Sequence, residues 1–453
     1  MRRRGTTAFV SAYNDECRAT GSGLLGVTER VTLPPKLAAA HGAGQLARPF
    51  FVGRGEIADF TVDLTAFFRL LVELPERLFD GDLDRYCAGV GISPARQAVM
   101  TRLKVNPVMH GRADLHHDGD SFKLLEFNIG THLGGTDRAE IMRLLGQDDA
   151  FGRFAEREGL SLTHTGAQIA RTLRRLGEQV SGDREPVIAF VEADGGLRPY
   201  LHLVLAFQEM MARLGLEVRL AEIGQLSSRA DKLYLDGTPL DVVLRYFSAN
   251  QLCADGGDGS IAEPIFRAHE AGRTILYTPL DGLLFEQKTS LAVLSEGIRQ
   301  GVFDAGELAL VDRLLPWTRR MNGALTDVAG ERVDLVEYCR EHREELLVKP
   351  GGSDGGQGLV TGWTVDDREW KETLTRCAGP DWLVQRRVVP RPEPVIGTDG
   401  VERDWFATWG MFLTPEGYGG FHVRALPAQD GALVYANNGE VRKTGVFEFP
   451  DDL

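Results

Sequence analysis

The spacing of apolar residues predicts helices in the first hundred residues and a mixture of strands and helices after them. Between residues 63 and 74 apolar side chains recur at helical spacing, which predicts an amphipathic helix ending just before Pro75. Further along, a continuous apolar run at 186–191 predicts a strand, a stripe at 201–214 a helix, and 216–223 a second strand. This order is typical of a β-α-β unit of Rossmann type.

Other segments add to this outline without changing it. A helix is expected from 136 to 145 with Thr136 or Asp137 as its N-cap. Residues 240–247 predict one more strand of the β-α-β region. The remaining predicted helices lie at 168–180, 290–300, 304–315 and 366–377.

Two short strand-like segments ahead of the β-α-β region carry polar residues at alternate positions. The sequence DGD at 118–120 is a turn signal, so the segments on either side are predicted to pair as a hairpin. Because strand side chains alternate between faces, Arg112 and Asp114 share one face of the first strand. Glu126 and Asn128 share a face of the second in the same way. Four polar groups are therefore expected on one side of the hairpin.

The four residue types on this hairpin suit a magnesium–phosphate site. Magnesium prefers carboxylate, amide and phosphate oxygens, and Asp114, Glu126 and Asn128 offer the first two kinds. The planar guanidinium of Arg112 can bind a phosphate oxygen. An ordinary solvated hairpin would show the same pattern, and for an isolated hairpin that plainer interpretation is favoured. A second phosphate-type element elsewhere in the chain is what favours the metal site.

Such an element is predicted at 346–360, where a strand, a lysine, a glycine-rich reversal and a second strand follow one another. Glycine permits positive φ and lets backbone N–H groups approach phosphate oxygens, while Lys349 adds a compact positive charge. The segment lacks the GK[ST] ending and the following helix of a Walker A motif, so a simple glycine-rich hairpin is the alternative. The glycines of the reversal are Gly351, Gly352, Gly355, Gly356 and Gly358.

Three further polar residues are candidates for the same site. Lys288 begins a predicted helix, where the helix dipole disfavours a cation unless an anion lies nearby. Gln385 lies on a strand ending at Pro390 that could present backbone groups to an adenine edge. Arg424 lies on an alternating strand at 421–424 and could contact a carboxylate or an acyl phosphate. Their plainer alternatives are a solvated lysine, a core strand with a surface glutamine, and a surface salt bridge.

Composition limits the classes of function. At 453 residues the chain exceeds the usual single core, so two or three lobes with a cleft between them are expected. A net charge of −14 argues against general nucleic-acid binding. The five cysteines lack C-x-x-C spacing, so neither a zinc site nor a disulfide framework is indicated. No apolar run approaches transmembrane length and no signal-peptide pattern is present, so a cytoplasmic protein with no membrane partner is expected.

Taken in order, these motifs resemble the synthetase domain of the glutathionylspermidine synthase family, the circularly permuted ATP-grasp ligases. The resemblance runs from about Met109 to Arg424 and is tightest over 112–128. It implies a mixed α/β (α+β) fold: an ATP-grasp core with a Rossmann-like pre-ATP-grasp substrate domain, and the nucleotide in the cleft between lobes. The expected division is a mostly helical segment at 1–105, a metal-binding hairpin with helices at 106–184, the substrate domain at 185–280, and the nucleotide-binding lobe with core strands at 281–453.

Residue by residue, the resemblance implies magnesium ligation by Asp114, Glu126 and Asn128, with Arg112 at the reacting phosphate and Arg424 facing the acyl phosphate. The residues implied to hold ATP are Lys288, Lys349, Gly351, Gly352, Gly355, Gly356, Gly358 and Gln385. The family loop usually reads G-R-E-G after its K-P, and this chain departs from it, which leaves substrate identity open. The amidase domain of some bifunctional members has no counterpart, because the N-terminal hundred residues show no Cys/His nucleophile arrangement.

The activity implied is an ATP-dependent carboxylate–amine ligase that forms an amide through an acyl phosphate and releases ADP and phosphate. Its partners would be a small carboxylate and an amine, such as an amino acid, a peptide or a polyamine, and a homodimer is a reasonable assembly. Two alternatives stay open: a phosphotransferase that releases a phosphorylated small molecule, and a catalytically degenerate ATP-binding module that regulates a partner.

Overall fold

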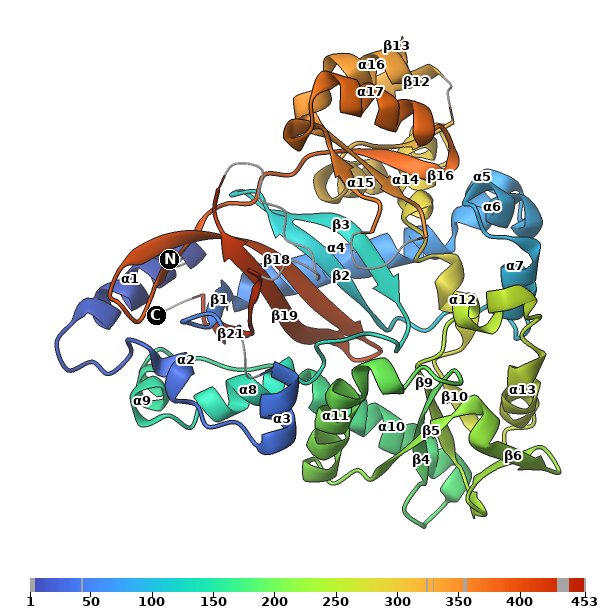
Figure 1. The fold of residues 1–453 in the computed structure, drawn as a ribbon, viewed down its shortest axis with the longest axis horizontal. Helices are drawn as coiled ribbons and strands as arrows, with labels where there is room; N and C mark the ends of the chain where they lie inside the picture. The colour runs from blue at the N-terminus through green and yellow to red at the C-terminus, as the bar shows by residue number, and fades with distance from the viewer. Residues whose placement is uncertain are drawn as a thin grey trace.

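A six-stranded antiparallel sheet forms the middle of the computed structural model (Figure 1), which describes residues 5–41, 44–322, 325–328, 330–352, 357–429 and 440–451. The strands follow the order β20, β19, β18, β2 and β3, and β17 pairs with the first residues of β18. Their bounds are β2 Gly111–His117, β3 Phe122–Ile129, β17 Glu393–Ile396, β18 Glu402–Thr414, β19 Gly417–Pro427 and β20 Arg442–Thr444. Segments about three hundred residues apart in sequence are thus neighbours in one sheet.

Strands β2 and β3 form the hairpin that the sequence predicts. The carboxylate of Asp118 accepts hydrogen bonds from two backbone N–H groups across the turn. In the resulting register Arg112 lies opposite Asn128, and Asp114 lies opposite Glu126. The four polar residues therefore do share one face, as their alternation along the strands requires.

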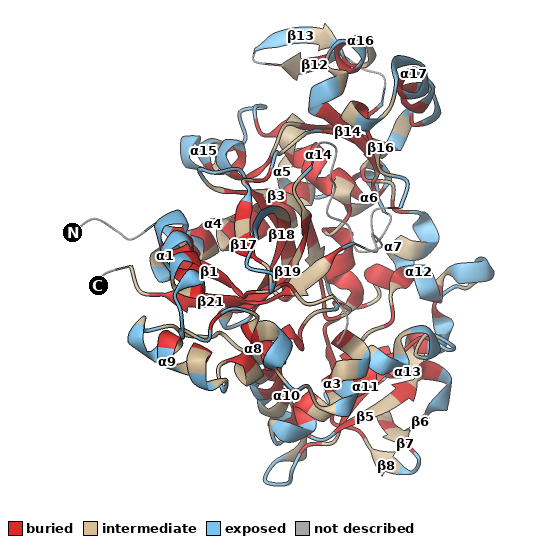
Figure 2. Ribbon diagram, turned by 60° about the vertical axis from the view of Figure 1, so that its left-hand side comes forward, coloured by how far each residue is buried: buried red, intermediate tan, exposed pale blue. Residues whose placement is uncertain are grey.

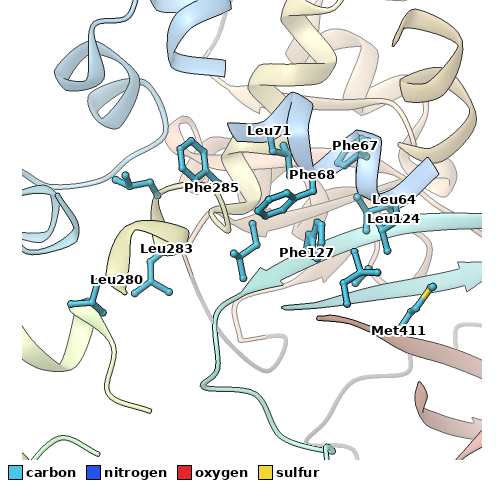
Figure 3. Packing of buried hydrophobic residues seen from close by; sticks show 14 of the residues in the cluster. Leu64, Phe67, Phe68, Leu71, Leu124, Phe127, Leu280, Leu283, Phe285 and Met411 are labelled. Atoms are coloured by element: carbon cyan, nitrogen blue, oxygen red, sulfur yellow. The ribbon is translucent and has the colours of Figure 1, made fainter. Parts of the chain in front are cut away.

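Helix α4 (Arg54–Val72) packs on the other face of this sheet. It begins well before the predicted residue 63, directly where strand β1 (Phe50–Gly53) ends, and it stops at Val72. Figure 3 shows its aromatic side chains over the hairpin, where the rings of Phe68 and Phe127 are 5.9 Å apart in an edge-on arrangement. Each fully buried side chain of this kind stabilises the fold by about 1.5–3 kcal/mol. This packing makes the hairpin a rigid floor for the polar residues on its far side.

The remaining N-terminal elements are mostly helical, as predicted. One strand was not predicted: β1 pairs in parallel with β21 (Val446–Phe449), which brings the two ends of the chain together (Figure 1). The helices are α1 Thr6–Arg18, α2 Val27–Arg30, α3 Pro35–His41, α5 Leu74–Phe79, α6 Leu83–Gly89 and α7 Pro94–Met100.

A second, parallel sheet contains the predicted β-α-β unit. Its order is β10, β9, β4 and β5, with all neighbours parallel. The bounds are β4 Ile188–Glu192, α11 Leu201–Arg213, β5 Val218–Glu222, β9 Val242–Arg245 and β10 Ile275–Tyr277, with α10 Thr165–Ser181 and α13 Glu263–Glu270 among its flanking helices. In open sheets of this type, ligands bind beyond the carboxyl ends of the strands. Glu192 and Arg245 stand at those ends.

A third sheet, at the top of Figure 1, has the antiparallel order β11, β16, β14 and β15. It confirms the predicted succession of strand, lysine, reversal and strand. The bounds are β11 Thr318–Met321, β14 Leu346–Pro350, β15 Val360–Thr361 and β16 Gly379–Arg386, with helices α14 Lys288–Gly297, α15 Ala305–Leu314, α16 Leu335–Glu341 and α17 Asp367–Arg376 and the hairpin β12 Leu325–Val328 and β13 Glu331–Asp334.

The outer elements are amphipathic, with buried residues on the side facing a sheet and exposed residues outward (Figure 2). The elements not yet given are α8 Arg138–Leu145, α9 Asp149–Arg157, α12 Ala249–Leu252, β6 Leu226–Arg229, β7 Lys232–Leu235 and β8 Thr238–Pro239. Within the ranges that the structure describes, none of the helices combines the length and the apolar character needed to span a bilayer.

Candidate active site

A cavity of about 740 Å³ lies between the polar face of the central sheet and the third sheet. That volume is within the usual range of small-molecule sites. Both sequence elements that predicted a phosphate site contribute to its walls, although more than two hundred residues separate them. The predicted site residues that line it are Arg112, Asp114, Glu126, Asn128, Lys288, Lys349, Gln385 and Arg424.

Two arginines hold Asp114 at the floor of this cavity. Arg112 donates from Nε to Oδ1 at 2.6 Å and from Nη2 to Oδ2 at 3.2 Å, and Arg424 donates from Nη2 to Oδ2 at 2.6 Å. Burial alone would raise the pKa of Asp114, but the charges of Arg112 and Arg424 outweigh it and hold that pKa well below its usual range. The carboxylate is therefore ionised at neutral pH, and it fixes the direction of both guanidinium groups.

A glycine makes this arrangement sterically feasible. Gly410 on β18 lies directly beside Asp114 in the sheet, and a Cβ atom there would be 2.8 Å from Cδ of Arg112 and 2.9 Å from the carbonyl oxygen of His422. Real Cβ atoms essentially never approach other atoms so closely. The missing side chain leaves the space in which the side chain of Arg112 lies as it reaches Asp114.

Glu126 and Asn128 are less buried than Asp114 on the polar face of the hairpin. Glu126 Oε2 is 3.1 Å from Nζ of Lys288, and its Oε1 accepts a 3.4 Å hydrogen bond from the amide nitrogen of Asn128. The anion expected beside the helix-initial Lys288 is thus a carboxylate of the protein itself. Asn128 lines the same cavity, and its amide nitrogen donates to the carbonyl oxygen of Arg112 and to Glu126.

These oxygens fit magnesium only in part. Asp114 already accepts three hydrogen bonds, so about one of its roughly four acceptor positions remains. Across the described ranges no group of three His, Cys, Asp or Glu side chains is placed to hold a metal ion. A magnesium ion at Glu126 and Asn128, with the one remaining acceptor position of Asp114, would take its other ligands from water and nucleotide phosphates, as this ion commonly does. Metal ligation by Asp114, Glu126 and Asn128 stays a prediction.

Lys349 projects from β14 toward the hairpin. Its Nζ donates to the carbonyl oxygen of Leu125 at 2.8 Å and to Oε1 of Gln385 at 2.9 Å. Leu125 is the extra residue of a β-bulge in the hairpin, and bulges are common next to active sites. Burial lowers the pKa of Lys349 to about 7; Glu126 acts against this shift and Lys288 adds to it. An incoming polyphosphate would supply the negative charge that this buried ammonium lacks.

Gln385 is almost fully buried, and its side chain is occupied by neighbours: it accepts from Lys349 and donates to the hydroxyl of Thr318 at 3.0 Å. Its predicted contact with adenine stays a prediction. The apolar wall of the cavity includes Trp363, over whose ring the guanidinium carbon of Arg387 lies at 4.2 Å. Sequence reasoning did not identify this pair, because the pairing depends on how a turn and a strand end meet.

The predicted glycines differ in their positions. Gly351 and Gly352 line a neighbouring cavity, and a Cβ on Gly351 would be 2.6 Å from Cγ2 of Thr289, so glycine lets the loop touch helix α14. Gly358 has a φ of +76° and packs near Pro350 and Trp382. Gly355 and Gly356 lie outside the described residues.

The neighbouring cavity has a volume of about 710 Å³ and lies between the central sheet and the carboxyl ends of the parallel sheet. It shares part of its wall with the first cavity, so the two spaces adjoin. The shared residues are Arg112, Asn128, His132, Leu133, Gly134, Lys288 and Arg424. Arg112 and Arg424 therefore face both spaces.

Comparison with solved structures finds similar folds at low sequence identity. A glutathione synthetase-like effector from Globodera pallida, in its apo form, is 14% identical; the match has a TM-score of 0.51 and covers 99% of this chain and 98% of that chain. A candidate gamma-glutamylcysteine synthetase from Methylobacillus flagellatus KT is 14% identical with a TM-score of 0.41, covering 84% of this chain and 86% of that one.

No protein-family model matches the chain, and no curated protein matches its sequence. The full-length match to the effector concerns the fold alone. It confirms the mixed α/β fold expected from the sequence, and this fold resembles that of a glutathione synthetase-like protein.

Proposed function

We propose that the protein is an ATP-dependent carboxylate–amine ligase that works through an acyl phosphate. The observation that carries this proposal is the first cavity, where carboxylate, amide and guanidinium groups of the hairpin face two lysines of the third sheet and helix α14. A site that brings several cations and hard oxygen ligands together around one cavity suits a magnesium-bound triphosphate. The adjoining second cavity leaves room for another substrate beside it.

The reaction proceeds in two steps. A carboxylate oxygen of the acid attacks the γ-phosphorus of ATP; the new O–P bond forms as the bond to the bridging oxygen breaks, and ADP leaves. The nitrogen of the amine then attacks the acyl carbon, the C–O bond to phosphate breaks, and the nitrogen loses a proton. The products are an amide, ADP and inorganic phosphate.

Each residue acts by charge and position. Lys349 and Lys288 bind phosphate oxygens of ATP and keep the γ-phosphate beside the hairpin. Arg112 and Arg424, oriented by Asp114, bind the oxygens on which charge builds up as the acyl phosphate forms. Glu126 and Asn128, with Asp114, would hold magnesium, which when bound neutralises negative charge on the phosphates.

The phosphotransferase alternative uses the same first cavity but only one substrate besides ATP. The second cavity favours the ligase, because it offers a further space that meets Arg112 and Arg424. A degenerate ATP-binding module would retain binding residues without a catalytic set. The full set of predicted cations and oxygen ligands around one cavity argues against it.

The test is ADP formation from MgATP across a panel of amino acids, peptides and polyamines, with mass detection of the joined product. The ligase requires both a carboxylic acid and an amine for phosphate release, and yields a product lighter by one water than the two substrates together. ADP formed with an acid or alcohol alone, together with a stable phosphorylated product, would favour the phosphotransferase. Nucleotide binding without turnover on the whole panel would favour the regulatory module.

A further inference from the structure

A third cavity, of about 530 Å³, lies outside the candidate active site. Its walls come from helices α14 and α15, strand β11, the β12–β13 hairpin and the end of β16. Among the described residues, Arg386 alone lines both this cavity and the first one, and the second cavity shares no lining residue with it. None of the site residues predicted from the sequence lies here, although the volume is in the usual range of small-molecule sites.

Positive charge predominates in the wall of the third cavity. Its described ionisable residues are three arginines and two aspartates, namely Arg299, Arg319, Arg386, Asp312 and Asp327. The chain as a whole carries a net charge of −14, so a local excess of cations runs against its average composition. Such an excess around a concave space is suited to an anionic ligand.

The innermost of these cations, Arg319, is held by neutral groups only. It lies on β11 and is 7% exposed. Its Nη1 donates to the hydroxyl of Ser295 at 2.7 Å and to the carbonyl oxygens of Ser295 and Thr318 at 3.1 and 2.9 Å. Its Nε donates to the hydroxyl of Thr326 at 2.8 Å, and its Nη2 donates to the carbonyl oxygen of Asp327 at 3.0 Å. No described aspartate or glutamate forms an ion pair with this guanidinium.

The next residue on the same strand is arranged differently. Arg320 donates from Nε and Nη2 to Oε2 of Glu296 at 2.9 and 2.6 Å, so its charge is neutralised within the protein. Burial lowers the pKa of Arg319, and the charges of Glu296 and Asp327, although not within ion-pair distance, act against this shift. A buried charge is costly unless it is paired. An anion in the third cavity would supply the counter-charge that Arg319 lacks.

The other two arginines are accessible to a ligand. The side chain of Arg386 donates to the hydroxyl of Tyr338 at 3.0 Å, and no described carboxylate pairs with it. Arg299 pairs with Asp312, whose two carboxylate oxygens are each 3.0 Å from Nη2, and both side chains of this pair are more than half exposed. An exposed pair of this kind contributes little to stability and can rearrange around a stronger anion.

We propose that the third cavity binds a phosphate group, as inorganic phosphate or as a small phosphomonoester, through Arg299, Arg319 and Arg386. A phosphate group carries nearly two negative charges at neutral pH, and its oxygens can accept hydrogen bonds from several guanidinium groups at once. A carboxylate has only two oxygens and is matched to a single guanidinium fork. This site is separate from the one proposed for the phosphates of ATP, and it does not depend on the ligase function.

The experiment is a calorimetric titration of the whole protein with inorganic phosphate and, separately, with glycerol phosphate. Ionic strength is held constant, and a saturating non-hydrolysable MgATP analogue occupies the first cavity. Acetate is the comparison anion. At least one of the two phosphate compounds should bind the wild-type protein about tenfold or more tightly than acetate does. Tighter binding of glycerol phosphate would identify the ligand as an ester, and tighter binding of inorganic phosphate would identify it as the free ion.

Two variants of one ion pair place the bound phosphate in the third cavity. Arg299→Gln should weaken phosphate binding about threefold to tenfold, because it removes a cation. Asp312→Asn should strengthen binding by a similar factor, because it removes a competing carboxylate and releases Arg299. Both substitutions break the same ion pair, so a purely structural effect would shift the Kd for phosphate in the same direction in both variants.

The matched controls are Arg340→Gln and Glu337→Gln. These residues form an exposed ion pair at 3.2 Å on helix α16 of the same lobe and do not line the third cavity. Each control variant should bind phosphate with the Kd of the wild-type protein. Because the variants compare one cavity with another part of its own lobe, their result stands whether or not the protein is a ligase.

Three outcomes would overturn the inference. The first is that neither phosphate compound binds more tightly than acetate. The second is that Arg299→Gln and Asp312→Asn leave the Kd for phosphate unchanged or shift it in the same direction. The third is that the control variants change this Kd as much as the cavity variants do.

Discussion

The buried Lys349 should make the affinity for ATP depend on pH. Burial brings its pKa down to about 7, so the amine of the nucleotide-free protein is half protonated at that pH. A neutral amine does not pair with phosphate, and binding above pH 7 therefore requires proton uptake. Because the protonated share falls from about one half at pH 7 to about one in eleven at pH 8, we expect the Kd for ATP to rise about fivefold over that unit.

Calorimetric titration of the nucleotide-free protein with a non-hydrolysable MgATP analogue measures this directly. Between pH 7.5 and 9, two buffers of different ionisation enthalpy should report proton uptake that approaches one per site. Lys349→Met should bind about tenfold to a hundredfold more weakly, the loss of one charged hydrogen bond, and should show no such uptake. Equal pH dependence in wild type and variant would refute the assignment of Lys349 to the phosphates.

The same shift in pKa acts on stability. In the unfolded chain the lysine has its ordinary pKa of 10.5, so between pH 7 and 10.5 the unfolded state binds more protons and stability rises with pH. The destabilisation by Lys349 is complete below pH 7 and is lost toward pH 10.5. From pH 7 to pH 9 the wild-type protein should gain about 2 kcal/mol relative to Lys349→Met in urea unfolding. No relative gain would show that this amine is not desolvated as the structure indicates.

Further substitutions test other parts of the site. Glu126→Gln should reduce ADP formation by about a hundredfold or more. Its Tm should change little, because the partly exposed ion pair of Glu126 with Lys288 contributes only about 0–1 kcal/mol. Full activity of this variant would contradict the role of Glu126. Gly410→Ala should displace Arg112, lower stability by about 1–3 kcal/mol and abolish turnover, and an active variant would show that Arg112 need not lie there. Met411→Ala, on the opposite face of the same strand, should lower the free energy of unfolding by about 2–5 kcal/mol yet leave the Kd for ATP unchanged. A change in Kd would mean that lost packing alone explains the effects of the other variants.

Local sequence patterns were sufficient for the parts of the fold that depend on neighbouring residues. The turn at 118–120 and the alternation around it predicted the hairpin and the shared face of Asp114 and Glu126. The reversal after Lys349 and the β-α-β unit were also recognisable, because each depends on one contiguous stretch. The argument that Lys288 needs an anion nearby was sound, and the anion is Glu126.

Contacts between distant segments were not predictable in the same way. No local signal shows that β18 lies between β2 and β19, so the need for glycine at Gly410 was invisible. Lys443 lies opposite Arg424 only because β20 pairs with β19. Asp137, one of the two predicted caps, is at the N-cap position of α8, but its side chain makes no cap hydrogen bond. Its carboxylate instead lies 2.7 Å from Nε2 of the buried His41, a partner from a distant segment of the chain.

The central claim is that the hairpin and the lysine-bearing sheet together hold one metal-bound triphosphate. A crystal structure with a non-hydrolysable ATP analogue and Mn²⁺ in place of Mg²⁺ tests it most directly. We predict phosphate density in contact with Lys349 and Lys288 and an anomalous manganese peak beside Glu126 and Asn128. A nucleotide bound elsewhere, or a manganese peak remote from the hairpin, would contradict the account.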